Sequence, residues 1–157
     1  MLRKFIAFAL LLVIAISCTK EVVVDYSATD KKIIEDYLAV HHLTAQSTAS
    51  GLYYIIKKPG GANHPNVNNQ ILVNYQGFLT DSNLFDTSYK LGTPAIFALN
   101  NVIAGWKEGL PMIGTGGEIQ LFIPSALGYG SIAKTSNYAP IPANSVLLFD
   151  IGLVDYY

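Results

Sequence analysis

Hydrophobic and polar residues alternate in several stretches of the C-terminal part of the chain. In residues 71–76, the apolar side chains of Ile71, Val73 and Tyr75 alternate with Leu72 and the polar pair at 74 and 76. A period of two is typical of an antiparallel strand with one buried face. Further strands are expected at residues 52–57, 119–123 and 146–154.

A stretch with helical period precedes the strands. Asp30 is expected to cap this helix, which is predicted near residues 30–42. Its apolar stripe consists of Ile33, Ile34, Tyr37 and Leu38, and His41 falls at the spacing that would extend it. Such a stripe usually packs on its own domain, and dimerisation through it is the alternative. His41 and His42 point about 100° apart on a helix, so neither they nor the isolated His64 predict a metal site.

A second, shorter helix is expected between the strands. Asn100 or Asn101 can cap it, and Ile103, Trp106 and Leu110 then fall on one face. A sheet with one buried face needs a cover, which this helix can supply. The pattern therefore predicts an α+β domain over residues 51–157, with a helical extension over residues 28–50.

The N-terminal residues have the features of an export signal. Arg3 and Lys4 precede an apolar run from Phe5 to Ile16. This run is shorter than the roughly 20 residues of a bilayer span, so a signal peptide over residues 1–17 is favoured over a transmembrane anchor.

Cys18 is the only cysteine and has no disulfide partner within the chain. The sequence Ala15-Ile16-Ser17-Cys18 resembles a bacterial lipobox, in which the cysteine is lipidated and becomes the new N-terminus. We therefore expect lipidation at Cys18, a tether over residues 18–27 and an exported protein anchored to the outer membrane facing the periplasm. Plain secretion is the alternative.

Composition narrows the class of partner. The chain is 51% hydrophobic and 11% aromatic, which excludes a disordered protein. Without Arg3 and Lys4 of the leader, 8 of the 10 basic residues remain against 11 acidic ones. A nucleic-acid partner is not expected, because binding phosphates requires a basic surface.

Short motifs in the second half of the chain follow one family pattern in order and spacing. They are Val73-x-Tyr75-x-Gly77-x-Leu79-x-Asp81, Phe85-Asp86-Thr87-Ser88, Pro94-x-x-Phe97-x-Leu99, Val102-Ile103-x-Gly105-Trp106-x-Glu108-Gly109-Leu110, Ile123-Pro124, Tyr129-Gly130, Ile141-Pro142 and Phe149-Asp150. Each motif alone is common. Together they closely resemble the FKBP-type peptidyl-prolyl isomerases over residues 51–157.

The resemblance implies a bent antiparallel sheet wrapped around a short helix, with a proline-binding pocket between them. It assigns catalytic roles to Tyr75, Asp86 and Tyr129. The residues that it implies for substrate binding are Phe85, Phe97, Val102, Ile103, Trp106, Ile141 and Phe149. It implies no cofactor or metal, proline-containing polypeptide clients, binding of macrolides such as tacrolimus, and a monomer or weak dimer.

Several of these residues have a simpler interpretation from sequence alone. A carboxylate at Asp86 commonly accepts hydrogen bonds from Thr87 or Ser88 in an exposed turn. A single Trp106 is commonly a core residue, and Tyr129 in a glycine-rich loop is commonly exposed. The family resemblance favours the pocket for all three.

The sequence departs from the family at a few positions. Ala95 stands where many members have an aromatic residue, and Lys90 and Leu91 stand near an arginine that some members use to hold the aspartate. The loop 131–144 is long. A non-catalytic holding chaperone and an assembly-factor lipoprotein that uses its N-terminal helix are therefore the alternatives to an isomerase.

Overall fold

The computed structural model describes residues 25–157. The expected signal peptide, Cys18 and most of the tether lie outside the described residues. In the described part no helix combines the length and the apolar character needed to cross a membrane.

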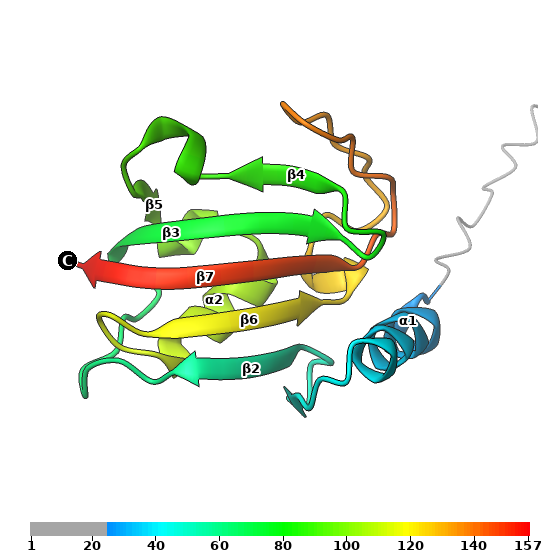
Figure 1. The fold of residues 1–157 in the computed structure, drawn as a ribbon, viewed down its shortest axis with the longest axis horizontal. Coiled ribbons are helices and arrows are strands. Elements are labelled where there is room, and N and C mark those ends of the chain that lie inside the picture. The colour runs from blue at the N-terminus through cyan, green and yellow to red at the C-terminus, as the bar shows by residue number, and fades with distance from the viewer. Residues whose placement is uncertain (1–24) are drawn as a thin grey trace, which may run out of the picture.

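The described residues form a seven-stranded antiparallel sheet with one helix across a face and another beside one end (Figure 1). The strand order is β1-β2-β6-β7-β3-β4, and β5 pairs with the N-terminal part of β3. The strands are β1 (Gln46–Ser47), β2 (Tyr53–Lys58), β3 (Gln70–Leu79), β4 (Leu84–Thr87), β5 (Ala95–Ala98), β6 (Glu118–Ile123) and β7 (Leu147–Tyr156). The helices are α1 (Ser27–Val40) and α2 (Ala104–Gly109), with short 3-10 helices η1 (Tyr89–Leu91), η2 (Leu99–Asn101), η3 (Leu110–Met112) and η4 (Ser125–Leu127). The predicted fold class is confirmed.

Alternation along β3 separates the two faces of the sheet as the sequence predicts. Ile71, Val73 and Tyr75 are buried, while Asn74 and Gln76 are only partly covered. The buried set faces α2 and joins the main core, which also contains residues of β6 and β7.

Helix α2 approaches the sheet closely because two of its residues lack side chains. A Cβ atom at Gly105 would lie 2.6 Å from Ile123, and one at Gly109 would lie 2.6 Å from Leu121. Since no side chain could fit there, the glycines allow α2 to lie directly on β6. Trp106 lies between these two glycines in the chain, so the same contact sets its height above the sheet.

Helix α1 packs on the other face, near one end of the sheet. Ile34 and Leu38 are buried there against Phe122 and Leu148, with Val146 in the same cluster. The helix therefore docks on its own domain, as the first interpretation of its stripe predicted. Ile33, which was expected in the stripe, is 36% exposed.

Both predicted helix caps are wrong. Helix α1 begins at Ser27 after Tyr26, and Asp30 is a buried residue of its first turn that binds Ser125 instead. Helix α2 begins after Ile103, because Asn101 belongs to the preceding 3-10 helix and neither cap position makes a side-chain cap bond. In both places a tertiary contact or a short 3-10 turn replaces local capping.

Candidate functional site

A small cavity lies between α2 and the face of the sheet that it covers. Its volume is about 220 Å³. The lining residues come from β3, β4, β5, α2, β7 and the loops next to them: Tyr75, Asp86, Phe97, Asn101, Val102, Ile103, Trp106, Tyr129 and Phe149. Concave, largely aromatic sites with a few polar groups are typical of ligand pockets.

Trp106 lies at the centre of the aromatic lining. Its ring centroid is 5.2 Å from Tyr75, 5.2 Å from Phe149 and 5.9 Å from Phe97, with interplanar angles of 82°, 85° and 88°. Perpendicular edge-to-face contacts of this kind are the preferred packing of aromatic rings. Because each ring is held by its neighbours, the cavity has a fixed shape.

The indole nitrogen Nε1 of Trp106 is buried and has no hydrogen-bond partner among residues 25–157. Tryptophan usually satisfies this donor when it is buried. The Trp106 indole N–H is therefore an unused donor within the aromatic lining.

Asp86 is held at the rim of the cavity by two donors. The Tyr75 hydroxyl donates to Oδ2 at 2.8 Å, and the Thr87 backbone N–H donates to Oδ1 at 2.9 Å. Both the expected phenol contact and the local turn contact are thus present. Burial, followed by the hydrogen bond to Asp86, raises the pKa of Tyr75 well above its ordinary value, so the phenol remains a donor at neutral pH.

Ser88 connects the strand pair that carries Tyr75 and Asp86, a role that the sequence alone does not indicate. The Tyr75 backbone N–H donates to Ser88 Oγ at 2.9 Å, and the Ser88 N–H donates to the Tyr75 carbonyl at 3.1 Å. Thr87 Oγ1 also donates to this carbonyl at 3.1 Å. The Ser88 side chain is therefore buried against β3 and does not serve Asp86.

Tyr129, in the loop after β6, lines the same cavity as Asp86 and is partly buried. Burial, with a smaller contribution from the charge of Asp86, raises the pKa of its phenol. The Lys134 ammonium lies 5.6 Å from the Tyr129 ring centroid. Tyr129 thus offers a neutral hydroxyl beside the carboxylate of Asp86.

A second cavity of about 400 Å³ adjoins the first and shares Asp86 and Tyr129 with it. It is lined by Phe85, Asp86, Tyr129, Lys134, Thr135, Ser136, Asn137 and Ile141. The structure therefore places Phe85 and Ile141, two of the expected binding residues, beside this second cavity. Phe85 also supports Phe149 from behind, at 5.4 Å and 86° between the rings.

Asn101 also lines the aromatic cavity, although the sequence indicates only a helix cap at this position. Its position directly before the Val102-Ile103 motif is the one signal that could have indicated a place in the lining.

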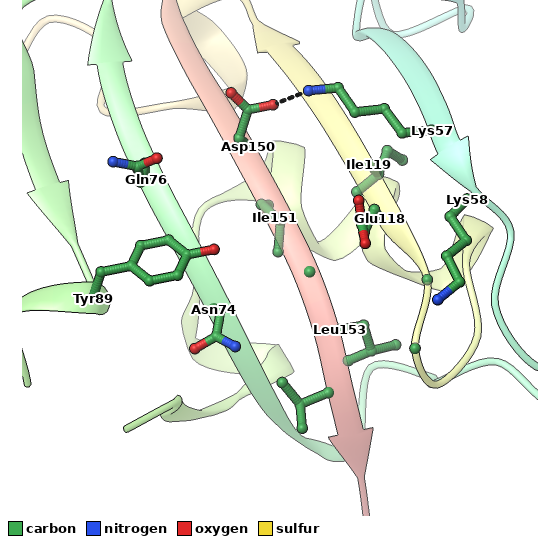
Figure 2. Close-up of a pocket in the computed structure, with 14 residues that line it drawn as sticks. Lys57, Lys58, Asn74, Gln76, Tyr89, Glu118, Ile119, Asp150, Ile151 and Leu153 are labelled. Carbon is green, nitrogen blue, oxygen red and sulfur yellow. Dashed lines mark hydrogen bonds and ion pairs between the residues drawn. The ribbon is translucent and has the colours of Figure 1, made fainter. Parts of the chain in front are cut away.

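A larger cavity lies on the opposite face of the sheet (Figure 2). Its volume is about 570 Å³, and its lining includes Asn74, Gln76, Glu118 and the Lys57–Asp150 ion pair with an Nζ to Oδ1 distance of 2.6 Å. It has no aromatic enclosure and its charges are paired or open to water. We therefore assign the candidate site to the smaller aromatic cavity.

The described residues include no group of three or more His, Cys, Asp or Glu side chains that could hold a metal ion. The polar side-chain groups that line the aromatic cavity are one carboxylate, two phenols and an amide. This set suits the binding of an amide group through hydrogen bonds.

Comparisons with known proteins agree with this geometry. A family model described as FKBP-type peptidyl-prolyl cis-trans isomerase matches residues 61–154. The chain is 50% identical over 109 residues to FkpA of Buchnera aphidicola (Schizaphis graminum) and 41% identical over 110 residues to FkpA of Escherichia coli K12. These matches cover 69% and 70% of this chain but 42% and 39% of the relatives, so the chain spans about two fifths of their length.

Solved structures show the same likeness. The crystal structure of FkpA from Escherichia coli matches with a TM-score of 0.70 and 36% identity, over 83% of this chain and 60% of that chain. The structure of AtFKBP13 matches with a TM-score of 0.65 and 32% identity, over 73% of this chain and 99% of that chain. With a family model that covers most of the chain, and with this fold and cavity, the chain belongs to the family of FKBP-type peptidyl-prolyl cis-trans isomerases.

Proposed function

We propose that this protein catalyses cis-trans isomerisation of X-Pro peptide bonds in polypeptide clients. The observation that carries the proposal is that Asp86, Tyr129 and Trp106 open onto one aromatic cavity of about 220 Å³. A proline ring can pack against the indole of Trp106, while the Tyr129 phenol and the Asn101 amide, which line the same cavity, are available to the carbonyl groups beside it. Family membership supports the same activity.

The reaction needs no covalent step. Resonance gives the amide a rotation barrier of about 18–20 kcal/mol, and an X-Pro bond isomerises unaided in roughly 10–100 s. In the twisted transition state conjugation is lost, so the carbonyl becomes less polar than in the planar amide. An aromatic cavity that excludes water suits this state better than the planar one, although part of the effect is equally described as replacing water by fixed protein groups.

The required acceleration is modest. A gain of about three decades in rate corresponds to roughly 4 kcal/mol of transition-state stabilisation. Ring packing and one or two hydrogen bonds are of this size, since a net hydrogen bond contributes about 0.5–1.5 kcal/mol. In this mechanism the Tyr129 phenol donates to a substrate carbonyl, and Tyr75 holds Asp86 facing the turning group.

The test is an isomerisation assay on the full chain, purified in mild detergent, with a short peptide that has an apolar residue before proline. We expect a rate above the uncatalysed one and inhibition by tacrolimus. A rate equal to the uncatalysed one, with the peptide still bound, would instead identify the protein as a holding chaperone.

We propose in addition that the protein is exported and held at the membrane by a lipid on Cys18. The support is the leader and the lipobox-like sequence Ala15-Ile16-Ser17-Cys18. Replacement Cys18→Ser is expected to release a folded, unlipidated protein from the membrane fraction. Membrane association of this variant at high salt would contradict the proposal.

A further inference from the structure

Asp30 is a buried carboxylate that does not line the candidate site. Its side chain is 1% exposed. Oδ2 accepts hydrogen bonds from the Ser125 backbone N–H at 2.8 Å and from Ser125 Oγ at 2.6 Å. Oδ1 is also buried and has no partner among residues 25–157. All the hydrogen bonding of this carboxylate in the described structure is therefore directed to one residue.

Ser125 connects this contact to the site. It is the first residue of η4, and its carbonyl oxygen accepts the N–H groups of Gly128 at 3.0 Å and Gly130 at 2.9 Å. These two residues flank Tyr129 in the chain. A continuous set of hydrogen bonds thus runs from Asp30 on α1 through Ser125 to both sides of Tyr129.

The loop around Tyr129 needs such support. Gly130 has a φ of +58°, in the left-handed region. Glycine has more backbone freedom to lose than other residues, so a tyrosine between two glycines is weakly fixed by its own chain. Ser125 is the residue that orders both glycines at once.

The helix that carries Asp30 is itself rigidly placed. Ile34, one turn after Asp30, is 1% exposed and packs in the same cluster as Phe122 and Leu148 of the sheet. If docking were the only requirement, apolar residues would serve it without the cost of burying a carboxylate with one unpaired oxygen. The polar contact is aimed instead at the loop that carries Tyr129.

We infer that Asp30 is a positioning residue: it holds Ser125, and through Ser125 it orients the Tyr129 phenol at the cavity. The inference rests on the proposed function for its effect on catalysis, but not for its effect on the loop. It makes the N-terminal helix part of the isomerase site, although none of its residues lines the cavity.

The test compares Asp30→Asn and Ser125→Ala with the matched control Asp36→Asn, an exposed carboxylate of the same helix that pairs with Lys32. In the full chain, each of the first two replacements is expected to lower kcat/KM by about 10-fold, the scale of a small displacement in a catalytic group. The control is expected to leave it unchanged. Ser125→Ala retains the backbone bond to Asp30, so it provides a variant that folds even if Asp30→Asn does not.

A double-mutant cycle separates positioning from general support. In a Tyr129→Phe background, Asp30→Asn is expected to lower kcat/KM by less than about 2-fold, because the group that it positions is absent. An equal loss in both backgrounds would show that Asp30 acts only on the overall fold and would overturn the inference.

A second measurement does not depend on activity. In NMR spectra of protein labelled in its tyrosine rings, Asp30→Asn and Ser125→Ala are expected to shift or broaden the Tyr129 signals, whereas Asp36→Asn leaves them in place. If the wild-type protein does not catalyse isomerisation, the proposed function fails while this experiment still decides on the positioning role. Unchanged Tyr129 signals in both variants would overturn that role.

Discussion

On the face of the sheet that carries α2, aromatic side chains of β3 and β7 line a cavity of about 220 Å³. On the opposite face, the same strands present Asn74, Gln76 and Asp150 to a cavity of about 570 Å³. Successive residues of a strand point to opposite faces, so a step of one residue leads from one face to the other. The smaller cavity has fixed walls and few polar groups that converge. The larger one has polar side chains that water can satisfy. The candidate site is therefore distinguished by its aromatic walls and by polar groups that converge on one cavity, and not by its volume.

The largest effect is expected on the enclosed face. Replacement Trp106→Ala removes the ring that contacts Tyr75, Phe97 and Phe149, and should lower the free energy of unfolding by about 3–5 kcal/mol. Peptide isomerisation should fall to the uncatalysed rate. Urea unfolding and the peptide assay measure the two effects. Trp106→Phe is the control and should retain most of the stability; an unchanged stability of Trp106→Ala would contradict the aromatic packing.

On the other face, Leu38→Ala tests whether the packing of α1 on the sheet contributes only to stability. Leu38 is 8% exposed and lies two turns after Asp30, so the expected loss is about 2–3 kcal/mol of unfolding free energy. The rate per folded molecule, measured well below the melting temperature, should not change. A selective loss of kcat in this variant would show that the two faces are coupled through the helix packing itself.

Replacement Tyr75→Phe removes the donor to Asp86 and should cost about 1.5–3 kcal/mol, the usual contribution of a hydrogen bond to a charged group. It also gives a pH test. Because the folded-state pKa of Tyr75 is raised above the ordinary value near 10, the stabilisation is complete below pH 10 and is lost as the pH rises beyond it. Between pH 9 and 11, the free energy of unfolding should therefore depend less steeply on pH in Tyr75→Phe than in the wild type. Parallel curves would contradict the assignment.

The smallest effect is expected in the polar hollow. Lys57 and Asp150 have side chains that are 46% and 41% exposed, so Lys57→Gln should change stability by about 0–1 kcal/mol, and less at high salt. Isomerisation should be unaffected. A loss of activity with a natural client, but not with a short peptide, would indicate that clients also contact this face.

The sequence could predict those parts of the molecule that depend on local pattern. Alternation at Ile71, Val73 and Tyr75 determines which face of β3 is buried, and the strand is where that alternation indicates. Resemblance then identified rings that are far apart in sequence, and Tyr75, Trp106 and Phe149 do meet around one cavity.

Residues whose role depends on a distant partner could not be predicted in this way. Asp30 has the local features of a helix cap, but its partner Ser125 is 95 residues away. Ser88 has the features of a turn residue, yet it bonds the backbone of Tyr75. In both cases a short polar side chain could make either a local or a tertiary hydrogen bond. The packing of the whole sheet decides which of the two forms.

Trp106 is the one tryptophan in the 157 residues, and it forms a wall of the aromatic cavity. Its intrinsic fluorescence therefore originates from the site alone, without background from other indoles. Titration with a proline peptide should change the emission directly, so occupancy can be followed in unlabelled protein and in the presence of lipid.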